Sequence, residues 1–210
     1  MKKWIDFNTW PRYQHYLFFK SYEMPRFNMT FPLDVTQLYQ IGKAKGYRFY
    51  FLLMHQVVLT LNQIENFRYR IEGGKVFDQP IEFVSFTDFI EAEQLFKMVF
   101  TKVDADYLTF EKTAINTSAK QGNLLIQMDK EMVLNTIYIT SFPWARFMHF
   151  THATKLSATD SVPRISWSQF QEENGKKILN FSVEVHHGLV DGYHVGLLIN
   201  QLQKRLNEYR

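Results

Sequence analysis

The chain has 210 residues, a length that suits one domain, and its net charge of +3 is small and spread along the sequence, which does not favour a nucleic-acid partner. Hydrophobic residues make up 46% of the chain and aromatic residues 17%, enough for a large core and for an apolar ligand cleft. Cysteine is absent, so disulfides, thiolate catalysis and cysteine-ligated metal sites are excluded.

The sequence shows no secretion signal behind Met1 and no apolar run that approaches a membrane span. It also shows no internal repeat, linker or low-complexity segment. We therefore expect a soluble, cytoplasmic protein with no membrane partner, folded as a single domain over residues 1–210.

The first part of the chain predicts helices around one strand. A capping residue followed by Pro11 predicts a short helix that carries Arg12, which by itself reads as a surface arginine. Residues 27–31 read as a strand, followed by a helix that stops near Gly46. A second helix over about residues 51–64 is apolar nearly all round, which indicates that it is buried.

The remainder of the chain predicts mostly strands and hairpins. Glycine-centred turns predict one hairpin of residues 67–71 with 75–77, and a long one of residues 164–170 with 177–187. Further strands are expected at residues 81–86, 96–103, 135–140 and 147–151, and a helix at residues 104–120. Interleaved strands and helices favour an α/β fold, with a mixed β-sheet that helices cover on one face.

The segment from Leu179 to His187 alternates between apolar and polar residues, which is typical of a strand. His187 falls at the end of the apolar face, and His186 points to the opposite face. Gly188 and Gly192 break the pattern, and apolar residues then recur at helical spacing. The sequence therefore predicts a strand, a tight turn and a helix, with a histidine where the strand ends.

A histidine at the edge of an apolar face is favoured as neutral imidazole, which can take a proton from a hydroxyl. The alternative for His187 is a packed core residue, and Asp191 could be only the N-cap of the next helix. No metal site is expected of His186, His187 and His194, because adjacent strand residues point apart and no cysteine assists.

The motif His186-His187-x-x-x-Asp191-Gly192 resembles the active-site signature of the type A chloramphenicol acetyltransferases. Its shorter His-x-x-x-Asp-Gly core also occurs in dihydrolipoamide acyltransferases. Residues 10–12, 140–144 and 163–166 match further motifs of the first family in the same order, so the resemblance runs from about residue 8 to the end. It implies a two-layer α/β fold and a homotrimer with active sites between subunits.

The resemblance also implies a reaction, in which acetyl-coenzyme A gives its acetyl group to a small-molecule hydroxyl and chloramphenicol is the first candidate acceptor. In it His187 is the general base, and Asp191 forms a buried salt bridge to Arg12 that holds the turn, while the backbone carbonyl of His187 orients its own ring. Thr140 matches the position of the oxyanion donor, and Ser141 beside it is the alternative.

By the same resemblance four residues line the acceptor cleft and two hold the coenzyme, although aromatic residues are more often core. The acceptor residues are Phe19, Met24, Phe150 and Ser166, and the coenzyme residues are Phe170 and Arg48. The chain departs from the family pattern at Glu184, where glutamine is usual, at His152, where leucine is usual, and at Gly188. These departures leave the acceptor open.

Two alternatives follow. The chain could be a coenzyme A-dependent acyltransferase of this fold that acts on another alcohol or on a dihydrolipoyl thiol, although it has no lipoyl domain or linker. It could also be a trimeric binding protein that keeps the fold without turnover. The joint presence of His187, Asp191 and Arg12 argues against the second alternative.

Overall fold

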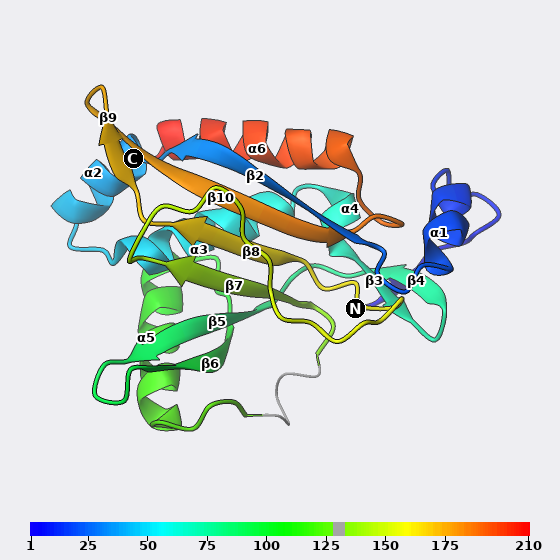
Figure 1. Ribbon diagram of the computed structural model, residues 1–210, viewed down its shortest axis with the longest axis horizontal. Coiled ribbons are helices and arrows are strands. Elements are labelled where there is room, and N and C mark those ends of the chain that lie inside the picture. Colours follow the sequence, from blue (N-terminus) through cyan, green and yellow to red (C-terminus); the bar gives the residue numbers. More distant parts are fainter. Residues whose placement is uncertain (128–132) are drawn as a thin grey trace.

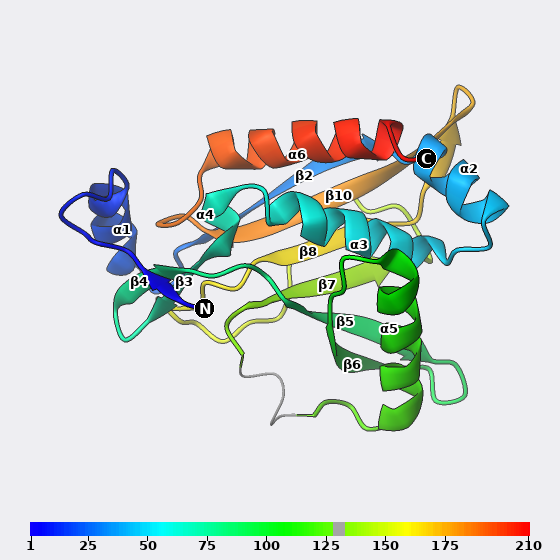
Figure 2. The same ribbon diagram turned by 180° about the vertical axis from the view of Figure 1, so that it is seen from behind.

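The computed structural model describes residues 1–127 and 133–210. A large mixed sheet runs through the molecule, and Figure 1 looks onto its open face while Figure 2 looks onto the helices that cover the other face. The predicted fold class, a two-layer α/β arrangement with helices on one side of the sheet, is therefore confirmed. Within the described residues no helix is both long and apolar enough to cross a membrane.

The large sheet has seven strands in the order β2-β10-β8-β7-β5-β6, with β9 paired to β10. Its strands are β2 (Arg26–Asp34), β5 (Phe83–Ile90), β6 (Leu95–Lys102), β7 (Thr136–Phe142), β8 (Arg164–Ser168), β9 (Gln171–Glu173) and β10 (Lys176–His186). β7 runs parallel to both of its neighbours, and the other pairs are antiparallel. β10 lies inside the sheet, because it pairs with the edge strand β2 along nearly its whole length and with β8 on its other side.

The helical layer is apolar where it faces the sheet. Its helices are α2 (Thr36–Ala44), α3 (Phe49–Leu61), α5 (Tyr107–Gln121) and α6 (Gly192–Asn207). α3 is buried along almost its whole length, as its all-round apolar sequence predicts, and α6 buries one stripe that includes Val195, Leu198 and Leu202. The apolar side chains of β10 pack against this layer, which fixes the face of β10 that turns inward.

A smaller unit lies beside the sheet at the end where β10 stops (Figure 1). It comprises a three-stranded sheet, helix α1 (Tyr13–Lys20) and the one-turn helix α4 (Glu65–Arg68). The small sheet has the order β1-β4-β3, from β1 (Lys3–Trp4), β4 (Lys75–Asp78) and β3 (Tyr69–Glu72). The predicted hairpin is confirmed, and Gly73 and Gly74 form its turn at φ of +57° and +75°, a region that glycine enters without strain. α1 begins at Tyr13, so Arg12 precedes the helix instead of lying on it.

The strand predicted at residues 147–151 is absent, and the prediction was wrong. This segment crosses the open face of the sheet, shown in yellow in Figure 1. Its backbone carbonyls accept hydrogen bonds from side-chain amides of the sheet below: Asn180 Nδ2 donates to the carbonyl of Phe147 at 2.6 Å, and Asn28 Nδ2 to that of Phe150 at 2.9 Å. Because these groups are satisfied from below, the segment needs no ladder partner.

The sheet divides between β5 and β7. The two strands pair from Phe83 with Thr136 to Phe86 with Ile139, and no farther. Beyond that point β5 stays with β6, while β7 stays with β8 as far as Phe142. The gap that opens between them is the position of the main cavity.

Candidate active site

The turn after β10 presents His187. β10 ends at His186, whose carbonyl accepts hydrogen bonds from the N–H groups of Leu189 and Val190, both at 3.0 Å. The N–H of His187 donates to the carbonyl of Pro25 at 2.7 Å, which ties the turn to the start of β2. The predicted order of strand, tight turn and helix is confirmed, with α6 beginning at Gly192.

The imidazole of His187 lies between two aromatic rings. It stacks on Phe19 with the ring centroids 4.1 Å apart and an interplanar angle of 9°, and its centroid lies 4.6 Å from that of Phe27. Nδ1 is buried and has no hydrogen-bond partner within the described residues. The side chain is half-buried, so the ring is held by its neighbours yet reaches the surface.

Arg12 ties the turn together, although sequence pattern alone favoured a surface position for it. Its guanidinium donates to Asp191 Oδ2 at 2.6 Å, to the carbonyl of His187 at 2.8 Å and to the carbonyl of Gly188 at 3.0 Å. Arg12 is buried. The salt bridge implied by the resemblance is present. The expectation that the backbone carbonyl of His187 orients the ring of the same residue was wrong, because Nδ1 makes no hydrogen bond among the described residues and the carbonyl accepts from Arg12.

Asp191 has two roles in the structure, as a partner of Arg12 and as the N-cap residue of α6. Its Oδ1 lies 2.8 Å from Nδ1 of His194. Burial by itself would raise the pKa of Asp191, but the hydrogen bond and the positive charge of Arg12 outweigh it and hold that pKa below its ordinary value. The carboxylate is therefore ionised and keeps the turn closed.

His186 faces away from His187, as alternation predicts, and is buried. Its Nδ1 accepts from the N–H of Gly188 at 3.0 Å, and its Nε2 lies 3.1 Å from the carbonyl oxygen of Ala158. Burial lowers the pKa of His186 to about 4. This histidine is a neutral structural group that joins the turn to the loop between β7 and β8.

We expect the stability of the fold to depend on pH through His186. Its pKa is lower in the folded than in the unfolded chain, so the unfolded chain binds the proton more tightly. The stabilisation is complete above the ordinary histidine pKa and is lost as the pH falls from about 6.5 toward 4, by about 3 kcal/mol. Urea unfolding between pH 4 and 7.5 measures this, and the same series on His186→Gln should have a flatter slope. Equal slopes would contradict the assignment.

The second part of the site is a cavity of about 850 Å³ in the gap between β5 and β7. Aromatic side chains make up much of its wall, Phe150 and Trp144 among them, and Thr140 and Ser141 line it from β7. The polar lining includes His152 and Arg164. A largely apolar cavity with a few converging polar groups has the character of a small-molecule site.

Thr140 and Ser141 belong to opposite faces of the sheet. Thr140 pairs with Ser166 of β8, which is almost fully buried on the open face. Ser141 pairs with Trp167 and contacts Tyr50 of α3, on the helical side. Of the two hydroxyls that the sequence left open, Thr140 therefore lies on the face that carries Phe150 and Ser166.

A third group lies where β8 leads into β9. The ring of Phe170 packs against those of Tyr39 and Phe49, at centroid distances of 5.1 and 5.9 Å. Nζ of Lys177 lies 4.6 Å from the centroids of both Phe170 and Tyr39. Arg48 is exposed and immediately precedes α3, whose N-terminus favours negative charge.

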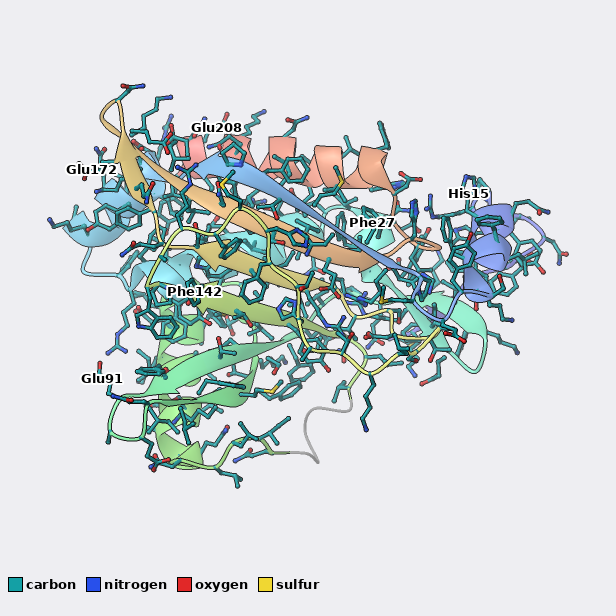
Figure 3. The ribbon with its side chains drawn as sticks, in the orientation of Figure 1. His15, Phe27, Glu91, Phe142, Glu172 and Glu208 are labelled. Carbon is teal, nitrogen blue, oxygen red and sulfur yellow. The ribbon has the colours of Figure 1, made fainter. Side chains whose placement is uncertain are left out.

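The turn and the cavity are far apart within one chain. Thr140 lies opposite Ser166, which lies opposite Ser182, and His187 is five residues farther along the chain than Ser182. At a strand rise of roughly 3.3 Å per residue, His187 and Thr140 are separated by roughly 17 Å along the strand direction alone. In Figure 3, Phe27, beside His187, and Phe142, at the end of β7, lie toward opposite ends of the sheet.

The predicted site residues divide accordingly. His187, Asp191, Arg12 and Phe19 come together at the turn, with Met24 exposed one residue before Pro25. Thr140 and Phe150 line the cavity, and Ser166 lies beside Thr140. Phe170 and Arg48 lie near the N-terminus of α3.

The sequence analysis missed two residues, Phe27 and Lys177, because matching single positions to the family motifs does not reach them. The pairing of β2 with β10 places Phe27 opposite Val185, so a prediction of that pairing would have found Phe27.

The profile of the chloramphenicol acetyltransferase family matches residues 2–203. A relative named chloramphenicol acetyltransferase, from Proteus mirabilis, is 26% identical over 204 residues, which are 97% of this chain and 94% of the relative. A relative of the same name from Staphylococcus aureus is 28% identical over 202 residues, 95% of this chain and 96% of the relative.

A solved structure named chloramphenicol acetyltransferase superposes with a TM-score of 0.89 at 22% identity, and the match covers 98% of this chain and all of that one. At that level of identity the likeness concerns the fold. It covers both sheets and the helical layer.

Proposed function

Because this chain belongs to the chloramphenicol acetyltransferase family and is therefore an acyltransferase, we propose that it transfers an acetyl group from acetyl-coenzyme A to the hydroxyl of a small molecule, with chloramphenicol as the first candidate acceptor. The observation that carries this proposal is the turn after β10. There Arg12 and Asp191 fix the backbone of His187, and two aromatic rings fix its imidazole. A histidine held this firmly at the surface suits proton transfer.

In the proposed reaction His187 takes the proton of the acceptor hydroxyl while the oxygen attacks the thioester carbonyl carbon. A tetrahedral oxyanion forms and collapses, the carbon–sulfur bond breaks, and the coenzyme sulfur takes the proton back from the imidazolium. The products are the acetyl ester and the free thiol of coenzyme A. The enzyme forms no covalent intermediate, consistent with a chain that has no cysteine.

The oxyanion is proposed to accept a hydrogen bond from Thr140. Both hydroxyls line the cavity, but Thr140 lies on the same face as Phe150 and Ser166, which supports this role, whereas Ser141 contacts Tyr50 on the helical side. A donor that already points where negative charge develops needs no reorganisation during the reaction.

We expect Thr140→Ala to lower kcat by ~10²–10³-fold, the loss typical of one oxyanion donor. Thr140→Ser keeps the hydroxyl and should retain most of the rate. Ser141→Ala is the matched control from the other face and should change kcat little. Steady-state kinetics on the three variants decide between the hydroxyls. If Ser141→Ala loses more kcat than Thr140→Ala, Ser141 is the oxyanion donor and the assignment of Thr140 is wrong.

We propose that the complete site forms between subunits of a homotrimer. A base and an oxyanion donor must act on one carbonyl group, yet His187 and Thr140 of one chain are too far apart to do so. A second copy that brings its His187 to the cavity removes the difficulty. Large apolar side chains exposed on or near the cavity, such as Trp144 and Met148, also support a covered face.

We expect light scattering to give about three times the 25.1 kDa mass of the chain. We further expect that His187→Ala and Thr140→Ala, each nearly inactive alone, recover part of the activity when unfolded and refolded together. A mixed trimer then contains sites with an intact His187 from one subunit and an intact Thr140 from the next. An active monomer, or mixed trimers without recovered activity, would contradict the shared site.

The coenzyme is proposed to bind near Phe170 and Arg48. The exposed guanidinium of Arg48, at the N-terminus of α3, fits a phosphate, and the aromatic group around Phe170 offers a flat surface to a base. Lys177 adds a second cation to the same area.

The proposal is tested by thiol release from acetyl-coenzyme A with chloramphenicol, a panel of small alcohols and dihydrolipoamide as acceptors. Release with chloramphenicol supports the first candidate. Release with another alcohol alone, or with dihydrolipoamide alone, keeps the acyltransferase but changes its acceptor. A folded trimer that releases no thiol with any acceptor would leave the non-catalytic binding protein as the function.

A further inference from the structure

Two of the departures from the family pattern, His152 and Glu184, are in direct contact. His152 directly follows the segment of residues 147–151 that crosses the open face of the sheet, and Glu184 lies on β10. Nδ1 of His152 lies 3.3 Å from Oε2 of Glu184. The ring of His152 also meets that of Phe150 edge to face at 5.1 Å, in the wall of the cavity. Glu184 therefore contacts the cavity wall through His152.

Glu184 is held as a carboxylate. Arg26 donates to its Oε1 from Nε at 2.8 Å, and Arg164 donates to the same oxygen from Nη1 at 2.6 Å, while Asp160 pairs with both arginines. Burial by itself would raise the pKa of Glu184, but the hydrogen bonds from His152 and the arginines, with the charge of Arg26, hold that pKa far below its ordinary value. An ionised carboxylate only accepts hydrogen bonds, so the proton between the two residues belongs to Nδ1 of His152.

The other nitrogen of His152 contacts Ser166. Nε2 lies 3.2 Å from Oγ of Ser166, whose side chain is almost fully buried beside Thr140. In a neutral imidazole with its proton on Nδ1, Nε2 is an acceptor. The hydroxyl of Ser166 must then donate to His152, and the direction of its proton is fixed.

We infer that His152, held by Glu184, is a positioning residue that accepts the hydroxyl proton of Ser166 in a hydrogen bond. Ser166 then presents its oxygen lone pairs, and not its proton, on the side of Thr140. Oγ of Ser166 can then accept a hydrogen bond from a water molecule, while the Thr140 hydroxyl stays free to donate to the oxyanion. The expected effect of His152 on the rate of acetyl transfer rests on the proposed function. The hydrogen bond from Ser166 to His152 does not, because it is a property of the folded chain.

Serine, histidine and glutamate in this order also form the nucleophilic triad of many hydrolases. Burial argues against that use here, because Ser166 is 1% exposed. A nucleophile must reach its substrate, whereas a hydroxyl that orients water or a neighbouring group need not. The arrangement therefore supports positioning and not acyl transfer through Ser166.

Three variants of His152 separate its two contacts. His152→Leu removes both. His152→Gln can place its amide oxygen near the position of Nε2 and accept from Ser166, whereas His152→Asn can place its amide near Nδ1 and keep only the contact with Glu184. We expect kcat to fall about tenfold in the leucine and asparagine variants, with the KM for acetyl-coenzyme A unchanged, and to stay within about threefold in the glutamine variant.

A double-mutant cycle with Ser166→Ala completes the test. If His152 acts through Ser166, His152→Leu should have little further effect on kcat in the Ser166→Ala background. Losses that multiply, or a glutamine variant no better than the asparagine one, would overturn the inference. Mass spectrometry during turnover should find no acetyl group on Ser166, and finding one there would overturn it too.

Nitrogen-15 NMR of the histidine rings gives a readout that needs no activity. We expect Nδ1 of His152 to carry a proton and Nε2 to carry none, and we expect a shift of the Nε2 resonance when Ser166 is replaced by alanine. The opposite tautomer, or no shift, would overturn the inference. If the wild type releases no thiol with any acceptor but the NMR result holds, the proposed function fails and the proton arrangement stands.

Discussion

Replacing His187 by alanine is expected to lower kcat/KM by ~10²–10⁴-fold, the range typical of a lost general base. The variant should still bind coenzyme A, because the groups proposed to hold the coenzyme, Phe170 and Arg48, lie at the opposite end of β10. In the wild type the rate should fall toward acid pH, since protonated imidazole cannot accept the acceptor's proton. Stopped-flow kinetics and calorimetric titration with coenzyme A measure the two properties separately.

His186→Ala is the control for this prediction, because it removes the same chemical group from the neighbouring position. It leaves the N–H of Gly188 and the carbonyl of Ala158 without their partners, and each unsatisfied buried group costs roughly 1–3 kcal/mol. The variant should therefore lose stability, and any loss of rate should be smaller than in His187→Ala. If His186→Ala were inactive but stable, and His187→Ala active with its pH profile intact, the assignment of the base would be wrong.

The strand pattern of the sequence was sufficient to separate these two histidines. Alternation from Leu179 onward assigns His186 and His187 to opposite faces, and the buried contacts of β10 agree. The pattern was informative because β10 pairs on both sides and one of its faces meets the helical layer, so a shift by one residue would bury polar groups without partners.

The sequence failed at residues 147–151 for an equally physical reason. Three of its five residues are apolar, but the partners of the backbone carbonyls are side-chain amides of Asn28 and Asn180, from strands distant in sequence. Local periodicity cannot detect a hydrogen bond from a side chain more than 30 residues away. The contact between His152 and Glu184 escaped prediction for the same reason, although each residue stood out singly.

The separation of the turn from the cavity could not be derived from the residue pattern of one chain, although the resemblance implied active sites between subunits. Matching motifs name His187 and Thr140 together, whereas the register of β10, β8 and β7 keeps them apart within one subunit. Motif order along a sequence records which residues serve one reaction, but not which copy supplies each of them. The register of the strands is what makes the proposal of a shared site necessary.

Arg12→Ala is expected to lower both stability and activity. The substitution removes three hydrogen bonds at once, to Asp191, His187 and Gly188, and leaves the carboxylate of Asp191 partly buried without its partner. Breaking a buried ion pair from one side costs about 3–5 kcal/mol, and the 29% exposure of the Asp191 side chain points to the lower end, about 3 kcal/mol. For a domain of this size that corresponds to a fall in Tm of roughly 6–12 °C.

The rate should fall for a separate reason, since a base displaced by about 1 Å can cost ~10²-fold. Arg68→Ala is the matched control, because Arg68 also donates to a carboxylate, that of Asp78, and to a backbone carbonyl, that of Asn62. It should lose comparable stability and retain kcat at a temperature where both variants are folded. An unchanged Tm in Arg12→Ala would contradict the buried pair. Equal losses of kcat in the two variants would mean that the fall in rate reports general destabilisation, and that Arg12 does not hold His187 in position.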